Sequence, residues 1–355
     1  MSVTQRQLAT QLGVSQMAVS FALNDKPGVN AKTRRRILDA AQEAGYRPNA
    51  AARATRSGTT GNVELILGQH EGVSRIPIGL LEGVEEALTA HGLHLSLSRL
   101  PDEKLTEEGF LPRVVREVAA DGLLINYTHS YPTALVELIR RHRIPAVWLN
   151  APLGENCVRP DDHAAGRLAA EHLLELGHRD PAMFFVSEPE HCSGVDRRRG
   201  FEGAVAAAGG TPRVRVEGSR PYREIRLDPT GDERLELTQR WLARPDRPTA
   251  VVGYSHAEST MLLIAAARLG LRVPRDLSIV CISDEVMPFL GTPLTTVVLP
   301  WAAIGRTAVE TLCQHFKRKP RARSVPTIEA RPALQAGATT APPGPTPPPA
   351  APASR

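Results

Sequence analysis

The chain is poor in the residues and runs that mark several classes of protein. Its 355 residues include only 4 cysteines, none spaced as Cys-x-x-Cys, so no disulfide framework or cysteine-rich metal site is expected. The cysteines are far apart in apolar or mixed contexts, which favours buried free thiols and a reducing compartment. No apolar run approaches the roughly 18 residues of a membrane span, and the polar start MSVTQRQL lacks a secretion signal. We therefore expect a cytoplasmic protein associated with neither a metal nor a membrane.

Motifs for common enzymatic chemistry are also missing. No Gly-x-Gly-x-x-Gly follows a strand-like run, and no phosphate loop of the Gly-x-x-x-x-Gly-Lys-Ser/Thr type occurs. His172 and His178 lie near a predicted helix end, but no nucleophile or metal partner accompanies them. From the sequence we therefore expect that the protein binds no cofactor and is not an enzyme.

The positive charge of the chain is concentrated at its start. Residues 1–60 contain nine lysines and arginines and three acidic residues, whereas the remainder is close to neutral, so this segment accounts for the net charge of +5. Basic charge gathered on one small module is typical of phosphate binding. At 355 residues the chain is also long enough for two or three domains.

Residues 4–24 predict two short helices joined by a tight turn. Thr4 is placed to cap the first helix, with Gln7 completing a capping box, and Gly13 supplies the conformation that ends it. Ser15 is placed to cap the second helix, whose first turn exposes Gln16 and Met17. This is the pattern of a helix-turn-helix, although an ordinary helical hairpin shares its local signals.

Two further helical segments follow. Asn30 is placed to cap a helix over residues 31–44, which Gly45 ends. Residues 50–56 form a short Ala/Arg stretch that cannot be a stable helix alone, because nucleation is too costly. We expect it to fold only against a DNA groove and a second subunit, ahead of a Ser/Gly/Thr linker.

From residue 62 to about 340, apolar strand-like runs alternate with amphipathic helices. The expected strands are 63–67, 94–98, 122–126, 146–149, 183–186, 250–254 and 278–282. The expected helices include 79–91, 133–142, 162–176, 199–208, 233–243 and 258–269. This alternation predicts an α/β fold with parallel sheets flanked by helices, and the number of strands indicates two lobes. Ligands of such sheets bind at the carboxyl ends of the strands, so facing lobes would form a cleft.

Four segments are therefore expected. They are a DNA-binding helical module over 1–48, a short helix and linker over 49–61, a two-lobed core over 62–340, and a tail over 341–355. The tail has seven prolines in fifteen residues and too few large apolar side chains to fold.

These residues together resemble the LacI/GalR family of bacterial transcription regulators. The matching blocks are TQRQLATQLGVSQMAVSFALN, GVNAKTRRRILDAAQEAGYRPN, AAEHLLELGHR, RRRGF, RPTAVV, GLRVPRDLSIV and PLTTV. The resemblance implies a helix-turn-helix headpiece, a hinge helix and linker over residues 49–61, and a periplasmic-binding-protein-like core over residues 62–340 that binds an effector and forms the dimer. It also implies a homodimer that binds a double-stranded operator and a small, sugar-like effector, most often acting as a repressor.

The resemblance assigns base contacts to the second helix. Gln16 can pair with adenine through two hydrogen bonds, and Met17 can offer only apolar contact. Phe21 departs from the family, where a polar or basic residue is usual, and packing within the headpiece is an equally good interpretation. The remaining expected DNA contacts are Thr4, Ser15, Ser20, Asn24, Tyr46, Asn49, Ala52, Arg53 and Thr55. Thr55 stands where relatives often carry a leucine wedge, so a weaker bend of the DNA is expected.

The resemblance also assigns an effector site. Its expected residues are Asn126, Asn150, Arg197, Ser255, Ser283 and Asp284. Asn150, Ser255 and Ser283 replace the Asp or Asn usual in the family, whereas Arg197 keeps its spacing to Gly200. The guanidinium suits a carboxylate or vicinal hydroxyls. His256 and Glu285 are further possible acceptors, and a cleft that has lost its ligand is the alternative.

Two other functions are compatible with the two-lobed fold. A solute-binding protein is disfavoured by the basic headpiece and the missing signal, and an enzyme by the missing motifs. Salt-dependent binding to duplex DNA separates these alternatives.

Overall fold

The computed structural model describes residues 3–47, 58–68, 76–100, 120–126, 133–189, 191–216, 232–286, 288–289, 291–317 and 324–344. The chain divides into two compact units, residues 1–60 and 61–355, each of which is considered by itself. The predicted hinge helix, with Asn49, Ala52, Arg53 and Thr55, lies outside the described residues, as do residues 345–355 of the predicted tail.

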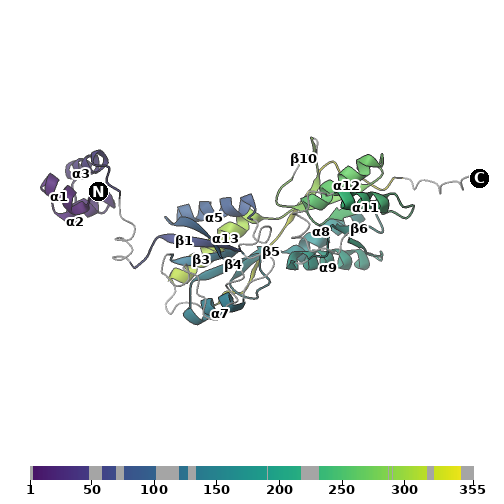
Figure 1. Ribbon diagram of the computed structural model, residues 1–355, viewed down its shortest axis with the longest axis horizontal. Coiled ribbons are helices and arrows are strands. Elements are labelled where there is room, and N and C mark those ends of the chain that lie inside the picture. Colours follow the sequence, from purple (N-terminus) through teal and green to yellow (C-terminus); the bar gives the residue numbers. More distant parts are fainter. Residues whose placement is uncertain are drawn as a thin grey trace, which may run out of the picture. The chain divides into compact units, whose positions relative to one another are not determined.

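The first unit is a three-helix headpiece (Figure 1). Its helices are α1 (Gln5–Leu12), α2 (Gln16–Leu23) and α3 (Ala31–Glu43). Thr4 and Gln7 form the capping box at α1, and Ser15 and Asn30 cap α2 and α3. Gly13 adopts φ +64 and ends α1, a conformation that glycine adopts without a Cβ clash. The helices enclose a small core of Leu8, Ala9, Val19, Ala22, Ile37 and Ala41.

The second unit contains two lobes, each built on a six-stranded sheet flanked by helices (Figure 1). The N-lobe sheet has the order β13-β5-β4-β3-β1-β2 and is parallel throughout. The C-lobe sheet has the order β14-β12-β9-β8-β6-β7 and is parallel except for β14. This architecture confirms the predicted two-lobed α/β fold.

The N-lobe strands are β1 (Asn62–Gly68), β2 (His94–Leu100), β3 (Gly122–Asn126), β4 (Ala146–Leu149), β5 (Cys157–Pro160) and β13 (Ile328–Ala330). Helices α5 (Ile78–Ala90) and α13 (Trp301–Lys317) pack together over one face, and α7 (Thr133–His142) covers the other (Figure 1). Alternation along the strands explains this: Leu65 belongs to the cluster under α5 and α13, whereas Ile66 belongs to the cluster under α7.

The C-lobe strands are β6 (Ala182–Phe185), β7 (Arg213–Val216), β8 (Ala250–Gly253), β9 (Ser278–Ser283), β12 (Thr295–Val298) and β14 (Ala333–Gln335). A separate two-stranded ribbon joins β10 (Pro288–Phe289) to β11 (Thr292–Pro293). Helices α8 (Asp162–Glu175) and α9 (Cys192–Ala207) cover one face, and α11 (Asp232–Leu242) and α12 (His256–Arg268) cover the other (Figure 1). None of the described helices is long and apolar enough to cross a bilayer.

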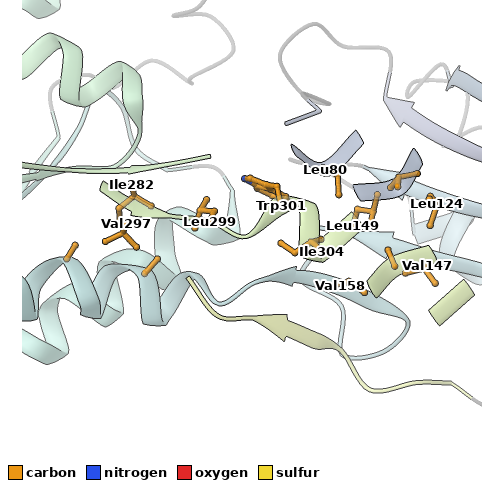
Figure 2. Packing of buried hydrophobic residues seen from close by; sticks show 14 of the residues in the cluster. Leu80, Leu124, Val147, Leu149, Val158, Ile282, Val297, Leu299, Trp301 and Ile304 are labelled. Atoms are coloured by element: carbon orange, nitrogen blue, oxygen red, sulfur yellow. The ribbon is translucent and has the colours of Figure 1, made fainter. Parts of the chain in front are cut away.

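The chain passes between the lobes three times, after β5, after β12 and after β13. The buried hydrophobic cluster follows the second passage, because Leu299 and Trp301 connect Ile282 and Val297 of the C-lobe with Leu80 and Ile304 of the N-lobe (Figure 2). The lobes therefore share part of their core at the passage that begins α13.

The C-lobe also holds the first residues of the predicted tail. Ala341 donates its N–H to the Ser278 hydroxyl, and its carbonyl accepts hydrogen bonds from Ser278 and from His178. The described chain therefore stays attached to the lobe beyond residue 340, the boundary that the sequence predicted.

Candidate functional sites

The exposed surface of α2 is the candidate DNA-reading surface of the headpiece. Gln16 and Met17 are exposed on its first turn, and 65% of the Met17 surface is accessible. The Ser15 hydroxyl accepts the N–H of Ala18, which fixes the beginning of the helix. Two side chains able to contact base edges thus project from a helix whose start is rigidly defined.

Phe21, the unusual residue of α2, lies against the following loop. Its ring carbons lie about 3.3 Å from where a Cβ on Gly28 would be, and its side chain is half-buried. The ring therefore contacts loop backbone, consistent with the packing interpretation. Asn24 caps the other end of α2 and donates from Nδ2 to the Ser20 carbonyl at 2.7 Å.

Some of the basic residues hold the headpiece together. Arg34 donates to the Asp25 carboxylate at 2.7 Å and to the carbonyl of Lys26, and Arg36 donates to the carbonyl of Leu12. These two guanidinium groups are engaged inside the module. The charge concentration seen in the sequence is therefore partly structural. Tyr46 is partly buried against the headpiece core.

The candidate effector site is a cavity of about 300 Å³ at the carboxyl ends of strands from both sheets. All six residues predicted for the effector line it: Asn126, Asn150, Arg197, Ser255, Ser283 and Asp284. Asn126 ends β3 and Ser283 ends β9, while Asn150 and Asp284 directly follow β4 and β9. Strand ends of parallel sheets meet at one edge, which explains why residues far apart in the sequence meet here.

Arg197 is bonded to the chain through two of its guanidinium nitrogens. Its Nε donates to Asp162 at 2.8 Å and its Nη1 donates to the Tyr254 carbonyl at 2.8 Å. The side chains of Arg197 and Asp162 are only 8% and 5% exposed, so this is a buried ion pair. Burial raises the pKa of the Asp162 carboxyl, and the adjacent guanidinium opposes that rise.

Glycines bring the helices that carry this pair into close contact. A Cβ on Gly200 of α9 would lie 2.0 Å from the carbonyl oxygen of His163 on α8, and a Cβ on Gly166 would lie 1.9 Å from that of Arg197. Only hydrogen at these positions lets the backbones approach. The Arg-x-x-Gly spacing noted in the sequence thus places the guanidinium next to Asp162.

A chain of hydrogen bonds extends from this pair to the N-lobe. The Asn150 carbonyl can only accept, so Nε2 of His191 donates to it at 3.1 Å. Nδ1 of His191 accepts the N–H of Ser193, so the imidazole is neutral and the Ser193 hydroxyl donates to it at 2.7 Å. The Tyr254 hydroxyl then donates to Ser193 at 2.7 Å. The guanidinium of Arg197 lies 4.7 Å from the centre of the Tyr254 ring.

Ser255 and Asp284 are also engaged with the chain. Ser255 caps α12, accepting the N–H of Ala257 and donating to the carboxylate of Glu258. Asp284 accepts a hydrogen bond of 2.5 Å from the indole nitrogen of Trp301. Asn150 has φ +54, a left-handed conformation that asparagine tolerates better than most residues.

Several residues of the cavity wall were not predicted. They include Ser187, Glu188, His191, Ser193, Tyr254, Glu258 and Trp301. Ser187, Glu188 and Tyr254 follow β6 and β8, so the rule that ligands bind at the carboxyl ends of strands contained the signal for them. No local sequence signal pairs Asp162 with Arg197. Among the described residues, no group of three or more His, Cys, Asp and Glu is arranged to hold a metal ion.

Comparisons with known proteins identify the family of both parts of the chain. A family described as bacterial regulatory proteins, lacI family, matches residues 6–49, and a periplasmic binding protein-like domain matches residues 170–340. The HTH-type transcriptional regulator AglR of Rhizobium meliloti is 33% identical over 312 residues, covering 83% of each chain. The HTH-type transcriptional repressor PurR of Erwinia tasmaniensis is 31% identical over 339 residues, covering 93% of this chain and 95% of the relative.

Solved structures share the fold. A lac repressor dimer bound to operator and the anti-inducer ONPF matches with a TM-score of 0.74 at 21% identity, over 96% of this chain and all of that one. A LacI family transcriptional regulator from Mycobacterium smegmatis matches with a TM-score of 0.60 at 29% identity, over 79% of this chain and 99% of that one.

Proposed function

The chain belongs to the LacI family of bacterial regulatory proteins and is a DNA-binding transcriptional repressor regulated by a small effector, and we propose that α2 reads the operator while the cavity of the core binds the effector. On this proposal, Gln16 and Met17 contact base edges. Ser15, Ser20, Asn24 and Tyr46 set the register on the phosphates. The exposed first turn of α2 is the observation that supports the assignment most directly.

The domain assignment follows from the same observations. The headpiece forms a compact unit with its own core, and residues 62–340 carry the two sheets. A headpiece of about 50 residues offers few contacts, so two copies on a pseudo-palindromic operator are proposed to supply the specificity. The roles of Asn49, Ala52, Arg53 and Thr55 in a hinge remain predictions.

Selection from a random duplex library by the full-length protein, followed by fluorescence anisotropy, tests the DNA assignment. Gln16→Ala is expected to cost about 1–3 kcal/mol at one base pair of each half-site and to leave other positions unchanged. Gln11→Ala changes an exposed glutamine of α1 and is expected to have no such effect.

Two outcomes would contradict this account. An equal loss of affinity for every DNA sequence would mean that Gln16 contacts phosphates and not bases. If the protein enriched no duplex from the library, the proposed DNA-binding function would be wrong.

The cavity supports the proposal of an effector site because polar side chains from both lobes line the same volume. A ligand that contacts Asn150 and Arg197 together would bias the angle between the lobes, and a change of that angle is how such a core could alter operator affinity. The relatives named above are transcription regulators, and we propose that this chain likewise acts in the cytoplasm without catalysing a reaction.

A further inference from the structure

The arginine of the cavity is already neutralised by the chain itself. Nε of Arg197 is bonded to Asp162, and Nη1 is bonded to the carbonyl of Tyr254. A ligand carboxylate or phosphate would have to compete for the guanidinium with Asp162, whose buried carboxylate already accepts from Nε. Of the two partners expected for this guanidinium, a carboxylate or vicinal hydroxyls, the protein itself thus supplies the carboxylate.

The other charged side chains among the described lining residues are all acidic. They are Glu188, Glu258 and Asp284. Glu258 is 1% exposed, and burial raises the pKa of its carboxyl, which disfavours its charged form. Glu188 and Asp284 are exposed, and with the one cation of the wall paired to Asp162 their carboxylates repel anions and favour cations.

Aromatic rings stand beside these acids. Phe185 and Tyr254 lie with ring centres 5.2 Å apart, and both line the cavity together with Trp301. The indole N–H of Trp301 holds the carboxylate of Asp284 in place at 2.5 Å. Aromatic faces next to carboxylates are the combination by which proteins bind ammonium groups, through cation–π attraction and charge-assisted hydrogen bonds.

A buried polar atom without a partner also lies in the cavity wall. Nδ1 of His256, the first residue of α12, is buried there and has no hydrogen-bond partner among the described residues. A buried nitrogen without a partner is costly, so a ligand group that bonds to it adds affinity.

We infer that the effector carries a positively charged nitrogen among hydroxyl groups, as in an amino sugar, and that Asp284 and Trp301 hold its ammonium group. This inference rests on the proposed function and specifies the chemistry of that effector. The hydroxyl groups would meet the polar side chains of the same wall, such as Asn150 and Ser283. Anionic sugars, such as uronic acids and sugar phosphates, are excluded by charge.

Calorimetric titration of the full-length protein with matched sugars tests the inference. The probes are the 2-amino forms of glucose, galactose and mannose, their neutral parent hexoses, and the corresponding uronic acids. We expect one amino sugar to bind about tenfold more tightly than its parent, and the matching uronic acid not to bind measurably.

Two variants distinguish the effect of the Asp284 charge from that of a neighbouring acid outside the cavity. Asp284→Asn keeps an acceptor for the Trp301 indole but removes the negative charge, and it is expected to reduce the preference for the amino sugar over its parent to less than threefold. Glu285, a possible acceptor on sequence grounds, is an exposed acid that does not line the cavity in the structure, so Glu285→Gln is expected to leave the preference unchanged.

The inference is overturned if a neutral or anionic sugar binds most tightly, if no amino sugar of the panel binds, or if Asp284→Asn leaves the preference intact. Operator binding of the same preparations is measured in parallel. A protein that binds its selected duplex but prefers an uncharged sugar would refute this inference alone, whereas one that binds no duplex would refute the proposed function.

Discussion

His191 of the C-lobe donates a hydrogen bond of 3.1 Å from Nε2 to the main-chain carbonyl oxygen of Asn150 in the N-lobe. Both residues line the effector cavity, so this bond connects the two lobes at the cavity wall. His191 also caps α9, accepting the N–H of Ser193 on Nδ1. One imidazole thus begins a helix and joins two lobes.

Substitution of His191 separates these two roles. Asparagine is a good N-cap but too short to reach Asn150, so His191→Asn is expected to lower the free energy of unfolding by about 1 kcal/mol through loss of the bond between the lobes. His191→Ala also loses the cap and is expected to cost about 1 kcal/mol more. Urea unfolding followed by circular dichroism measures both. Unchanged stability of His191→Asn would show that the bond between the lobes contributes nothing.

The Arg197–Asp162 ion pair can be tested by a double-mutant cycle on the free energy of unfolding. Arg197→Met is expected to cost about 3–5 kcal/mol, because it leaves the Asp162 carboxylate buried without its cation. Adding Asp162→Asn to the same chain is expected to recover most of that loss, since the buried charge is then gone. Thermal unfolding of the single and double variants checks the cycle. Additive losses would mean that the two side chains act independently.

Two glycines of α9 provide a matched comparison. Gly200→Ala is expected to destabilise the core by about 1–3 kcal/mol or more, because its Cβ would meet the carbonyl oxygen of His163 at 2.0 Å. Gly203→Ala lies on the same helix with nothing within 4 Å of its Cβ, and it is expected to stabilise by about 0.5–1 kcal/mol. Melting temperatures should therefore move in opposite directions. A shift in the same direction would refute the close approach of α8 and α9.

His178 predicts how the stability of the C-lobe depends on pH. The residue is 3% exposed, its ring is bonded to Thr249, Ser278 and Ala341, and burial lowers its pKa below the ordinary 6.5. The unfolded chain takes up a proton near pH 6.5 while the folded chain does not. The free energy of unfolding should therefore fall as the pH drops from about 6.5 to the lower pKa of the folded state.

His178→Gln tests this dependence against the wild type. Urea unfolding between pH 7.5 and 5 is expected to show a shallower decline in the variant, because the buried imidazole is gone. If the free energy of unfolding fell equally with pH in the variant and the wild type, titratable groups other than His178 would cause the decline.

Local signals made the headpiece predictable. Thr4 and Gly13 define the beginning and end of α1, and Ser15 the beginning of α2, through contacts within four residues that the structure has. Helix α9 shows the opposite case. The sequence placed its beginning near residue 199, whereas it begins at Cys192, because an unusual histidine cap and a glycine-containing first turn give no local start signal.

Short edge strands escaped prediction for a related reason. Strand β7 alternates arginine with valine over four residues, and β13 and β14 have three residues each. Such segments become strands because a neighbouring strand is already in place. In the same way, nothing in the sequence joins Asp162 to Arg197, since 35 positions separate them and only the packing of α8 on α9 brings them together.

The order of the strands also governs how the protein is made. The N-lobe begins at Asn62, but its covering helix α13 and its edge strand β13 are not complete until Ala330. At about 5–20 residues per second, a ribosome needs roughly 13–54 s for that stretch. During this time the headpiece can fold, whereas the apolar face of β1, β3 and β4 stays exposed until α13 has been synthesised and packs on it. Messenger RNAs truncated before codon 301 would therefore yield a folded headpiece attached to an incomplete core with exposed apolar surface, which chaperones and proteases would recognise.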